Sequence, residues 1–135
     1  MWSTFVIGEQ PSGSRWSAQD RGRRLLYDGL VDCGAMDAHL TDIIKSRGVG
    51  PEWKEWPAEQ LCSHIDLLRR EITLLHAKQF IVLGTQARNL FAAHFPQHAA
   101  STKMVPHFGY LRRVPPEKVD AWKDDFRKTL RNALK

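Results

Sequence analysis

Three short segments that contain small and polar residues lie, by pattern, at the ends of three predicted strands. The first is Gly8-Glu9-Gln10-Pro11-Ser12, the second is Thr41-Asp42-Ile43-Ile44-Lys45, and the third runs from Pro106 to Arg112. In an open parallel α/β sheet, ligands bind outside the carboxyl ends of the strands. We therefore expect the three segments to meet at one edge of a sheet and to form a ligand pocket there.

The elements that would position these segments follow from hydrophobic patterning. Short apolar runs predict strands at Trp2 to Ile7, Ala38 to Ile44, Gln79 to Leu83 and Thr102 to Val105. Apolar residues at helical spacing predict helices over Ala18 to Val31, from Pro57 through Leu75, from Thr85 as its cap to about Ala93, and from Pro115 onward. This alternation predicts the α/β class, with one three-layer α/β/α domain around a central four-stranded parallel sheet.

Length and composition indicate one globular domain over residues 1–135. The chain has a mass of 15.5 kDa, 42% hydrophobic residues and 26% charged residues, and no apolar run approaches the roughly 20 residues of a membrane span. The first residues, Met1 to Phe5, lack the basic stretch and apolar core of a secretory signal. We expect a cytoplasmic monomer with no membrane contact.

The charged and metal-binding residue types favour a polyanionic partner over a metal. The net charge is +5 and the pI is near 9.5, and such a balance favours binding to phosphate-rich partners. The cysteines, Cys33 and Cys62, form no Cys-x-x-Cys pair, and the six histidines show no zinc-site spacing. We expect reduced thiols and no metal.

The order and spacing of the motifs resemble the uracil-DNA glycosylase superfamily, and most closely its branch that often carries an iron–sulfur cluster. The resemblance lies in Leu40 to Arg47, in Cys62 followed by a helix with Glu71-Ile72, and in Phe80 to Ala87, a strand that ends in Leu-Gly. Gly8-Glu9-Gln10-Pro11 is similar to the Gly-Glu-x-Pro-Gly loop of that branch, and His107-Phe108-Gly109-Tyr110-Leu111 to its His-Pro-Ser loop. The resemblance implies a protein that binds DNA and hydrolyses the N-glycosidic bond of a flipped base.

Several positions depart from that pattern. Ser46 stands where the branch has a cluster cysteine, and of the four cluster ligands only Cys62 remains. We therefore expect no cluster and no other cofactor.

The resemblance implies three catalytic residues. Gln10 stands at the family's water-handling position, and its amide can orient water but cannot deprotonate it. Glu9 could act as a base if burial raised its pKa, although in the family this position contributes mainly through its backbone. His107 corresponds to the histidine that donates to a base carbonyl as negative charge builds. The alternatives are a polar strand-end turn for the first two residues and an ordinary loop histidine for the third.

The base itself would be held by Gly8, Trp16 and Asp42, while Phe5 and Phe80 fit the core better. Asp42 replaces the asparagine that reads the flipped base, and an ionised carboxylate only accepts hydrogen bonds. A base with an amino group would suit Asp42 better than uracil does, unless the carboxyl is protonated. The alternative is an aspartate that caps a helix or a turn.

Further residues are expected to contact DNA. Tyr110 or Leu111 could wedge into the duplex, or both could cover the core, and the arginines nearby could grip phosphate. Arg21, Arg23 and Arg24 could approach phosphate or form a solvated helix face, and Trp53 and Trp56 could be a stacking platform or pack over the domain edge. The expected DNA-binding set is Lys45, Gly109, Tyr110, Leu111, Arg112 and Arg113.

Two rival functions remain open. One is a nucleic-acid-binding module that keeps the fold without turnover, motivated by Gln10 and Asp42 at positions that normally carry the chemistry. The other is an enzyme that acts on a modified pyrimidine or a free nucleotide.

Overall fold

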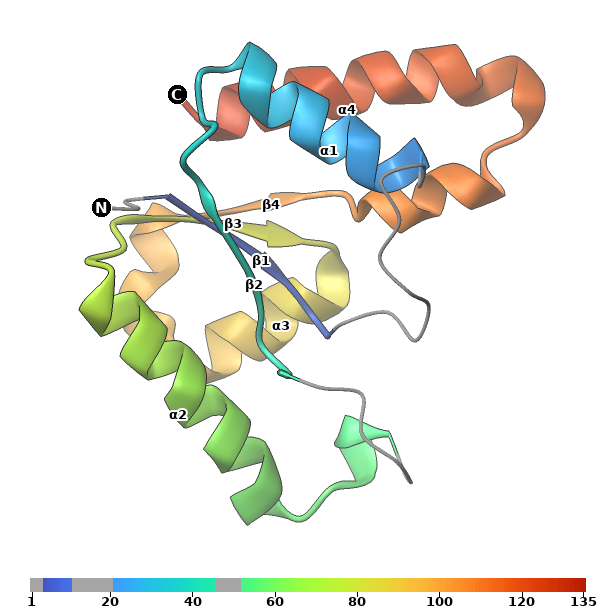
Figure 1. Cartoon of the computed structure of the whole chain (residues 1–135). Helices are drawn as coiled ribbons and strands as arrows, with labels where there is room; N and C mark the ends of the chain where they lie inside the picture. The colour runs from blue at the N-terminus through green and yellow to red at the C-terminus, as the bar shows by residue number, and fades with distance from the viewer. Residues whose placement is uncertain (1–3, 11–20, 46–51) are drawn as a thin grey trace.

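A parallel sheet of four strands lies at the centre of the computed structural model of this protein, which describes residues 4–10, 21–45 and 52–135 (Figure 1). The strands are β1 (Thr4–Gly8), β2 (His39–Asp42), β3 (Gln79–Leu83) and β4 (Thr102–Val105), in the spatial order β2-β1-β3-β4. Their registers are parallel, with Val6 beside Leu40 on one side and beside Ile81 on the other. The expected α/β class and four-stranded parallel sheet are confirmed.

Helices cover both faces of this sheet (Figure 1). The helices α1 (Arg21–Asp32) and α4 (Val119–Ala133) lie on one face, and α2 (Ala58–Leu74) and α3 (Thr85–His94) lie on the other. Short 3-10 helices occupy Trp53–Glu55, Pro96–Ser101, Phe108–Arg113 (η3) and Pro116–Lys118. In the described part of the chain, no helix is long and apolar enough to cross a membrane.

Strand periodicity divides the core into two halves. Phe5 and Ile7 of β1 and Phe80 of β3 face α2 and α3, whereas Val6 and Ile81 face α1 and α4. All five side chains are at most 1% exposed, because successive residues of a strand point to opposite faces of the sheet. Burial of each such side chain stabilises the fold by about 1.5–3 kcal/mol, so this alternation stabilises the sheet that positions the strand ends.

The start of α3 differs from the expectation in one detail. Gly84, not Thr85, is the N-cap residue, with φ at 90°, and its N–H donates to the Val105 carbonyl at 2.8 Å. A positive φ favours glycine, so the chain turns sharply at Gly84 and Thr85 becomes the first residue of the helix. This turn directs the residues after β3 toward the end of β4.

The strand order creates a crevice beside the carboxyl end of β1. From β1 the chain moves to β2 on one side, and the later strands β3 and β4 lie on the other side. The helices that follow β1 and β3 therefore leave toward opposite faces of the sheet (Figure 1). Open α/β sheets bind their ligands at such a switch point.

Candidate functional site

A cavity of about 880 Å³ lies at the carboxyl edge of the sheet. Its lining includes Gly8 at the end of β1, Asp42 at the end of β2, Gly84 after β3 and His107 after β4. A volume of this size lies within the range of about 300–1,000 Å³ that is usual for small-molecule sites. All four strand ends thus contribute to one cavity.

Most of the predicted site residues line this cavity. From the catalytic and base-binding predictions, Glu9, Gln10, His107, Gly8 and Asp42 do so, and from the DNA-binding prediction Gly109, Arg112 and Arg113 do. Trp16, the predicted stacking residue, lies outside the described residues. Lys45, Tyr110 and Leu111 are not among the lining residues.

Asp42 lies directly against Gly8. A β-carbon built on Gly8 would lie only 2.4 Å from Asp42 Oδ1, so a side chain at residue 8 would require the carboxylate to move. The backbone at Gly8 does not have a positive φ. The close approach of the carboxylate, and not a positive φ, therefore favours glycine at residue 8.

Burial governs the electrostatics of Asp42. Loss of solvent raises the pKa of this carboxyl above 3.8, although the positive charges of Lys45 and Arg23 act in the opposite direction. Glu71 adds a small further rise in the pKa through charge repulsion. The ionised form of Asp42 is thus less stable in these surroundings than it would be in water.

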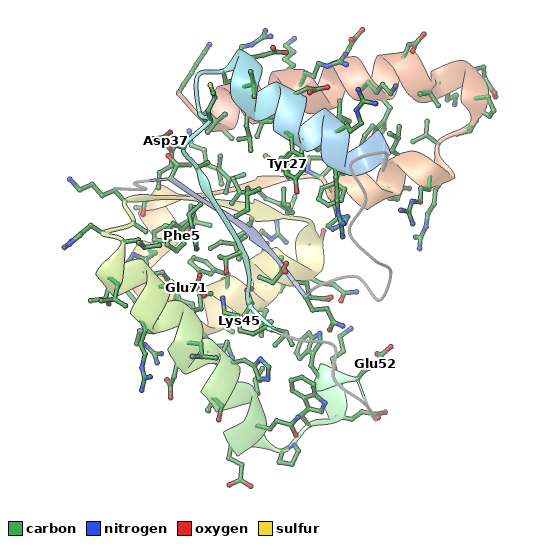
Figure 2. All side chains as sticks on the ribbon, in the orientation of Figure 1. Phe5, Tyr27, Asp37, Lys45, Glu52 and Glu71 are labelled. Atoms are coloured by element: carbon green, nitrogen blue, oxygen red, sulfur yellow. The ribbon has the colours of Figure 1, made fainter. Side chains whose placement is uncertain are left out.

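A polar cluster lies behind Asp42, between β2 and α2. Lys45 Nζ donates to a carboxylate oxygen of Glu71 and to Thr41 Oγ1 at 2.7 Å, while the Thr41 hydroxyl donates to Glu71 Oε2 at 2.9 Å. His39 Nε2 also donates to Glu71 Oε2 at 2.9 Å. Figure 2 shows Lys45 and Glu71 near one another between the end of β2 and α2.

The Glu71 carboxylate is the centre of this cluster, which we call the Glu71 cluster (His39, Thr41, Lys45 and Glu71). Burial raises the pKa of Glu71, but the hydrogen bonds from Lys45, His39 and Thr41 outweigh burial and lower the pKa below 4.5. The predicted DNA-binding residue Lys45 therefore ties the turn after β2 to α2, and its side chain is 19% exposed.

His64 of α2 fixes the backbone of the same turn. Its Nδ1 accepts a hydrogen bond from the Lys45 backbone N–H at 2.9 Å, and its ring lies 5.0 Å from that of Trp56. Burial, together with the positive charge of Lys45, lowers the pKa of His64 below 6.5. A neutral His64 is needed here because a protonated Nδ1 cannot accept a hydrogen bond. Trp56 and Trp53 pack against the core on this side, which agrees with the domain-edge alternative for them.

Glu9 has a partner inside the cavity. When the Gln86 side-chain amide is oriented so that both its oxygen and its nitrogen have hydrogen-bond partners, the nitrogen donates to both Glu9 carboxylate oxygens at 2.8 Å. The Glu9 backbone carbonyl accepts from Ile44 N–H at 2.9 Å, which extends the β1–β2 pairing beyond the strands. Gln10 follows at the edge of the described segment, half-buried and lining the cavity.

The orientation of His107 is determined by a local hydrogen bond. The Gly109 N–H donates to His107 Nδ1 at 2.9 Å and caps the start of η3. In the neutral ring the proton must then be on Nε2, which makes that nitrogen a hydrogen-bond donor. The His107 ring stacks on Phe108 with a centroid separation of 4.4 Å. The side chain is thus arranged to donate from Nε2.

Basic and aromatic residues from α1 and η3 complete the cavity wall. Arg23 and Tyr27 come from α1, and Phe108, Arg112 and Arg113 come from η3, which packs against α1. Figure 2 shows Tyr27 on the side of α1 that faces the strands. The three arginines give the cavity a positively charged side, in addition to the negatively charged carboxylates of its lining.

The two predicted wedge residues have different positions. Leu111 is buried, with 7% of its surface exposed, because η3 turns it toward the interior. Tyr110 is 56% exposed, and its ring lies 6.4 Å from that of Trp122. Of the two, Tyr110 is the residue that could reach a bound duplex, and for Leu111 the core alternative applies.

The described residues contain no group of three or more His, Cys, Asp or Glu side chains that could hold a metal ion. Cys33 and Cys62 are free thiols, and Cys62 is exposed on α2. The Glu71 cluster is satisfied by its own hydrogen bonds and has the character of a structural anchor.

Sequence reasoning missed three lining residues that carry useful groups. Gln86 follows the end of β3, and the argument applied to the other strand ends could have found it. Tyr27 stands four residues after Arg23 and so shares its helix face, while Phe108 lies inside the predicted third segment.

Comparisons with known proteins add no assignment. The sequence matches no protein-family model, and it matches no curated protein sequence. The function is therefore inferred from the cavity and its residues.

Proposed function

We propose that this protein is a DNA glycosylase of the uracil-DNA glycosylase superfamily, which hydrolyses the bond between deoxyribose and a flipped, modified or deaminated base. The observation that carries the proposal is that residues at or just after the carboxyl ends of all four strands line one cavity. Among them are the residues at the family's catalytic and base-reading positions, Gln10, His107 and Asp42. The positively charged side of the cavity suits the phosphates on either side of a flipped nucleotide.

The chemistry needs few groups. The oxygen of a water molecule bonds to C1′ of the sugar, the C1′–N bond breaks, and its electron pair leaves with the base. Gln10 would orient the water, whose proton passes to Glu9 or to solvent. His107 Nε2 would donate a hydrogen bond to the departing base as its negative charge builds. The Gly109 hydrogen bond to His107 Nδ1 supports this role because it fixes the required tautomer.

A second candidate is a nucleic-acid-binding module without turnover. Gln10 has no group that takes up a proton. When the Gln86 amide is oriented with its nitrogen toward Glu9, the Glu9 carboxylate already accepts hydrogen bonds from Gln86. Both observations favour binding over catalysis. This candidate keeps the same cavity and the same arginines and differs only in the absence of product.

The test is incubation of the purified protein with labelled oligonucleotides that contain uracil, hypoxanthine, xanthine, 5-hydroxymethyluracil or cytosine, followed by alkaline cleavage of abasic sites. We expect cleavage at one base, and a fall in rate of about 10²-fold or more in His107→Ala, as is typical when a donor to developing charge is lost. Gln10→Ala should also slow the reaction. Gln97→Ala and His94→Ala, which change the same residue types outside the cavity, should retain the wild-type rate.

The result also separates the two candidates. DNA binding that weakens with salt, without abasic product from any of these bases, would support the binding module and contradict the glycosylase. Cleavage that His107→Ala and Gln10→Ala leave unchanged would show that another protein or another site is responsible.

A further inference from the structure

Asp42 is a carboxylate in the cavity to which the described part of the chain offers no hydrogen-bond donor. The side chain is half-buried and lines the cavity beside Gly8. The hydrogen bonds and ion pairs of the described residues include none that ends on its oxygens. A partly buried carboxylate without a donor loses hydration with no hydrogen bond to replace it.

The simplest structural role for Asp42, capping of the turn that follows β2, does not apply. A capping or turn aspartate accepts from the backbone N–H groups two or three residues later. Here the Ile44 N–H donates to the Glu9 carbonyl at 2.9 Å, and the Lys45 N–H donates to His64 Nδ1 at 2.9 Å. The Ile43 N–H donates to the Gly8 carbonyl at 3.0 Å. These three donors are therefore used elsewhere.

The positive charge that acts most strongly on Asp42, that of Lys45, is also engaged with other groups. Lys45 Nζ binds Glu71 and Thr41 and acts on Asp42 only through its charge. Glu9, the other carboxylate in the lining, differs because Gln86 can donate to it. A hydrogen-bond donor to the Asp42 carboxylate must therefore come from outside the described residues.

We propose that the ligand supplies this donor, and that the preferred base carries an exocyclic amino group on its pairing edge, as cytosine and its modified forms do. This inference rests on the proposed function and specifies the substrate class of the same cavity. It differs from a preference for uracil, which has a carbonyl oxygen where cytosine has the amino group.

The preference follows from the chemistry of the two edges. Asp and Glu side chains accept hydrogen bonds from the cytosine amino group, and an ionised carboxylate has acceptors only. Beside uracil, one carboxylate oxygen would face O4, and two acceptors would repel each other. An asparagine at residue 42 could present either its oxygen or its nitrogen, so Asp42→Asn should remove the preference.

The experiment measures binding, so it does not depend on turnover. Two duplexes carry 2′-fluoroarabino cytosine or uracil, whose glycosidic bonds resist hydrolysis, opposite a tetrahydrofuran abasic analogue, so that no base pair must break. Competition is followed at pH 7.5 by fluorescence anisotropy for the wild type, Asp42→Asn and Asp37→Asn. Asp37 is an exposed residue at the opposite end of β2 from Lys45 (Figure 2), so Asp37→Asn makes the same change in charge away from the cavity.

For the wild type we expect cytosine to bind about tenfold or more tightly than uracil, as one hydrogen bond to a charged group allows. Asp37→Asn should keep this ratio, and Asp42→Asn should reduce it to within about threefold of unity or reverse it. Equal binding by the wild type, or a ratio that Asp42→Asn leaves unchanged, would overturn the inference while leaving the glycosylase proposal intact. Absence of abasic product together with the expected ratio would overturn the glycosylase proposal alone, and absence of binding to either duplex would overturn both.

Discussion

Substitution of Gly8 by alanine tests the geometry on which the site depends. The new β-carbon would lie 2.4 Å from Asp42 Oδ1, about 1 Å closer than an ordinary contact. Because the backbone at Gly8 has no positive φ, alanine adds no conformational strain. The cost arises from overpacking alone, and such changes destabilise by about 1–3 kcal/mol. With an m-value of about 2 kcal/mol per molar urea, the midpoint should fall by about 0.5–1.5 M.

A double-mutant cycle assigns this cost to the carboxylate. In Asp42→Ala the oxygens are gone and the next atom near the new β-carbon is the Thr41 carbonyl oxygen at 4.0 Å. Gly8→Ala should therefore cost less than about 0.5 kcal/mol in that background, with a coupling of at least about 0.5 kcal/mol. Gly29→Ala, whose β-carbon would lie 2.7 Å from Leu130 Cδ2, is the control and should cost the same in both backgrounds. Additive effects of Gly8→Ala and Asp42→Ala in urea denaturation would refute the contact.

Three further predictions concern stability. Since burial raises the Asp42 pKa above 3.8, the folded state binds the proton more tightly than the unfolded state, and Asp42 lowers the free energy of unfolding as pH rises from 3.8 through the folded pKa. The stability that Asp42→Asn adds, measured by urea denaturation, should therefore grow from pH 3.8 upward. A difference between the two proteins that does not change with pH would contradict this. Glu71→Gln should destabilise by about 1–2 kcal/mol at pH 7, and because the Glu71 pKa is lowered, the loss should shrink as pH falls through the folded pKa. Phe80→Ala should cost about 3–5 kcal/mol in the same assay, whereas Leu74→Ala, 75% exposed, should stay within about 0.5 kcal/mol.

The fold could be predicted because its signals are local. β3 and β4 begin and end at the predicted residues, since buried strands between helices show as short apolar runs. The meeting of Gly8, Asp42 and His107 could also be predicted, because parallel strands all end at the same edge of the sheet. This prediction does not depend on how far apart the three residues lie in the sequence.

The side-chain partners could not be predicted in the same way. Lys45 binds Glu71, a residue 26 positions later on α2, and a local pattern does not show which helix face will pass the end of β2. Leu111 is buried because His107 Nδ1 caps a 3-10 helix that turns it inward, where the sequence indicated only a loop. Arg23 and Tyr27 reach the cavity because α1 packs against η3, which is a tertiary contact.

Hydrolytic removal of a base from DNA is the activity that we propose for this cavity. It is tested by single-turnover incubation of the wild type and His107→Ala with duplexes that contain each of the bases named under the proposed function. Free base is measured by mass spectrometry, and abasic strand is measured in the same sample. We expect equal molar amounts of free base and abasic strand from one class of base, with release slowed by about 10²-fold or more in His107→Ala. Intact strands and no free base from any duplex, at protein concentrations that saturate binding, would contradict it.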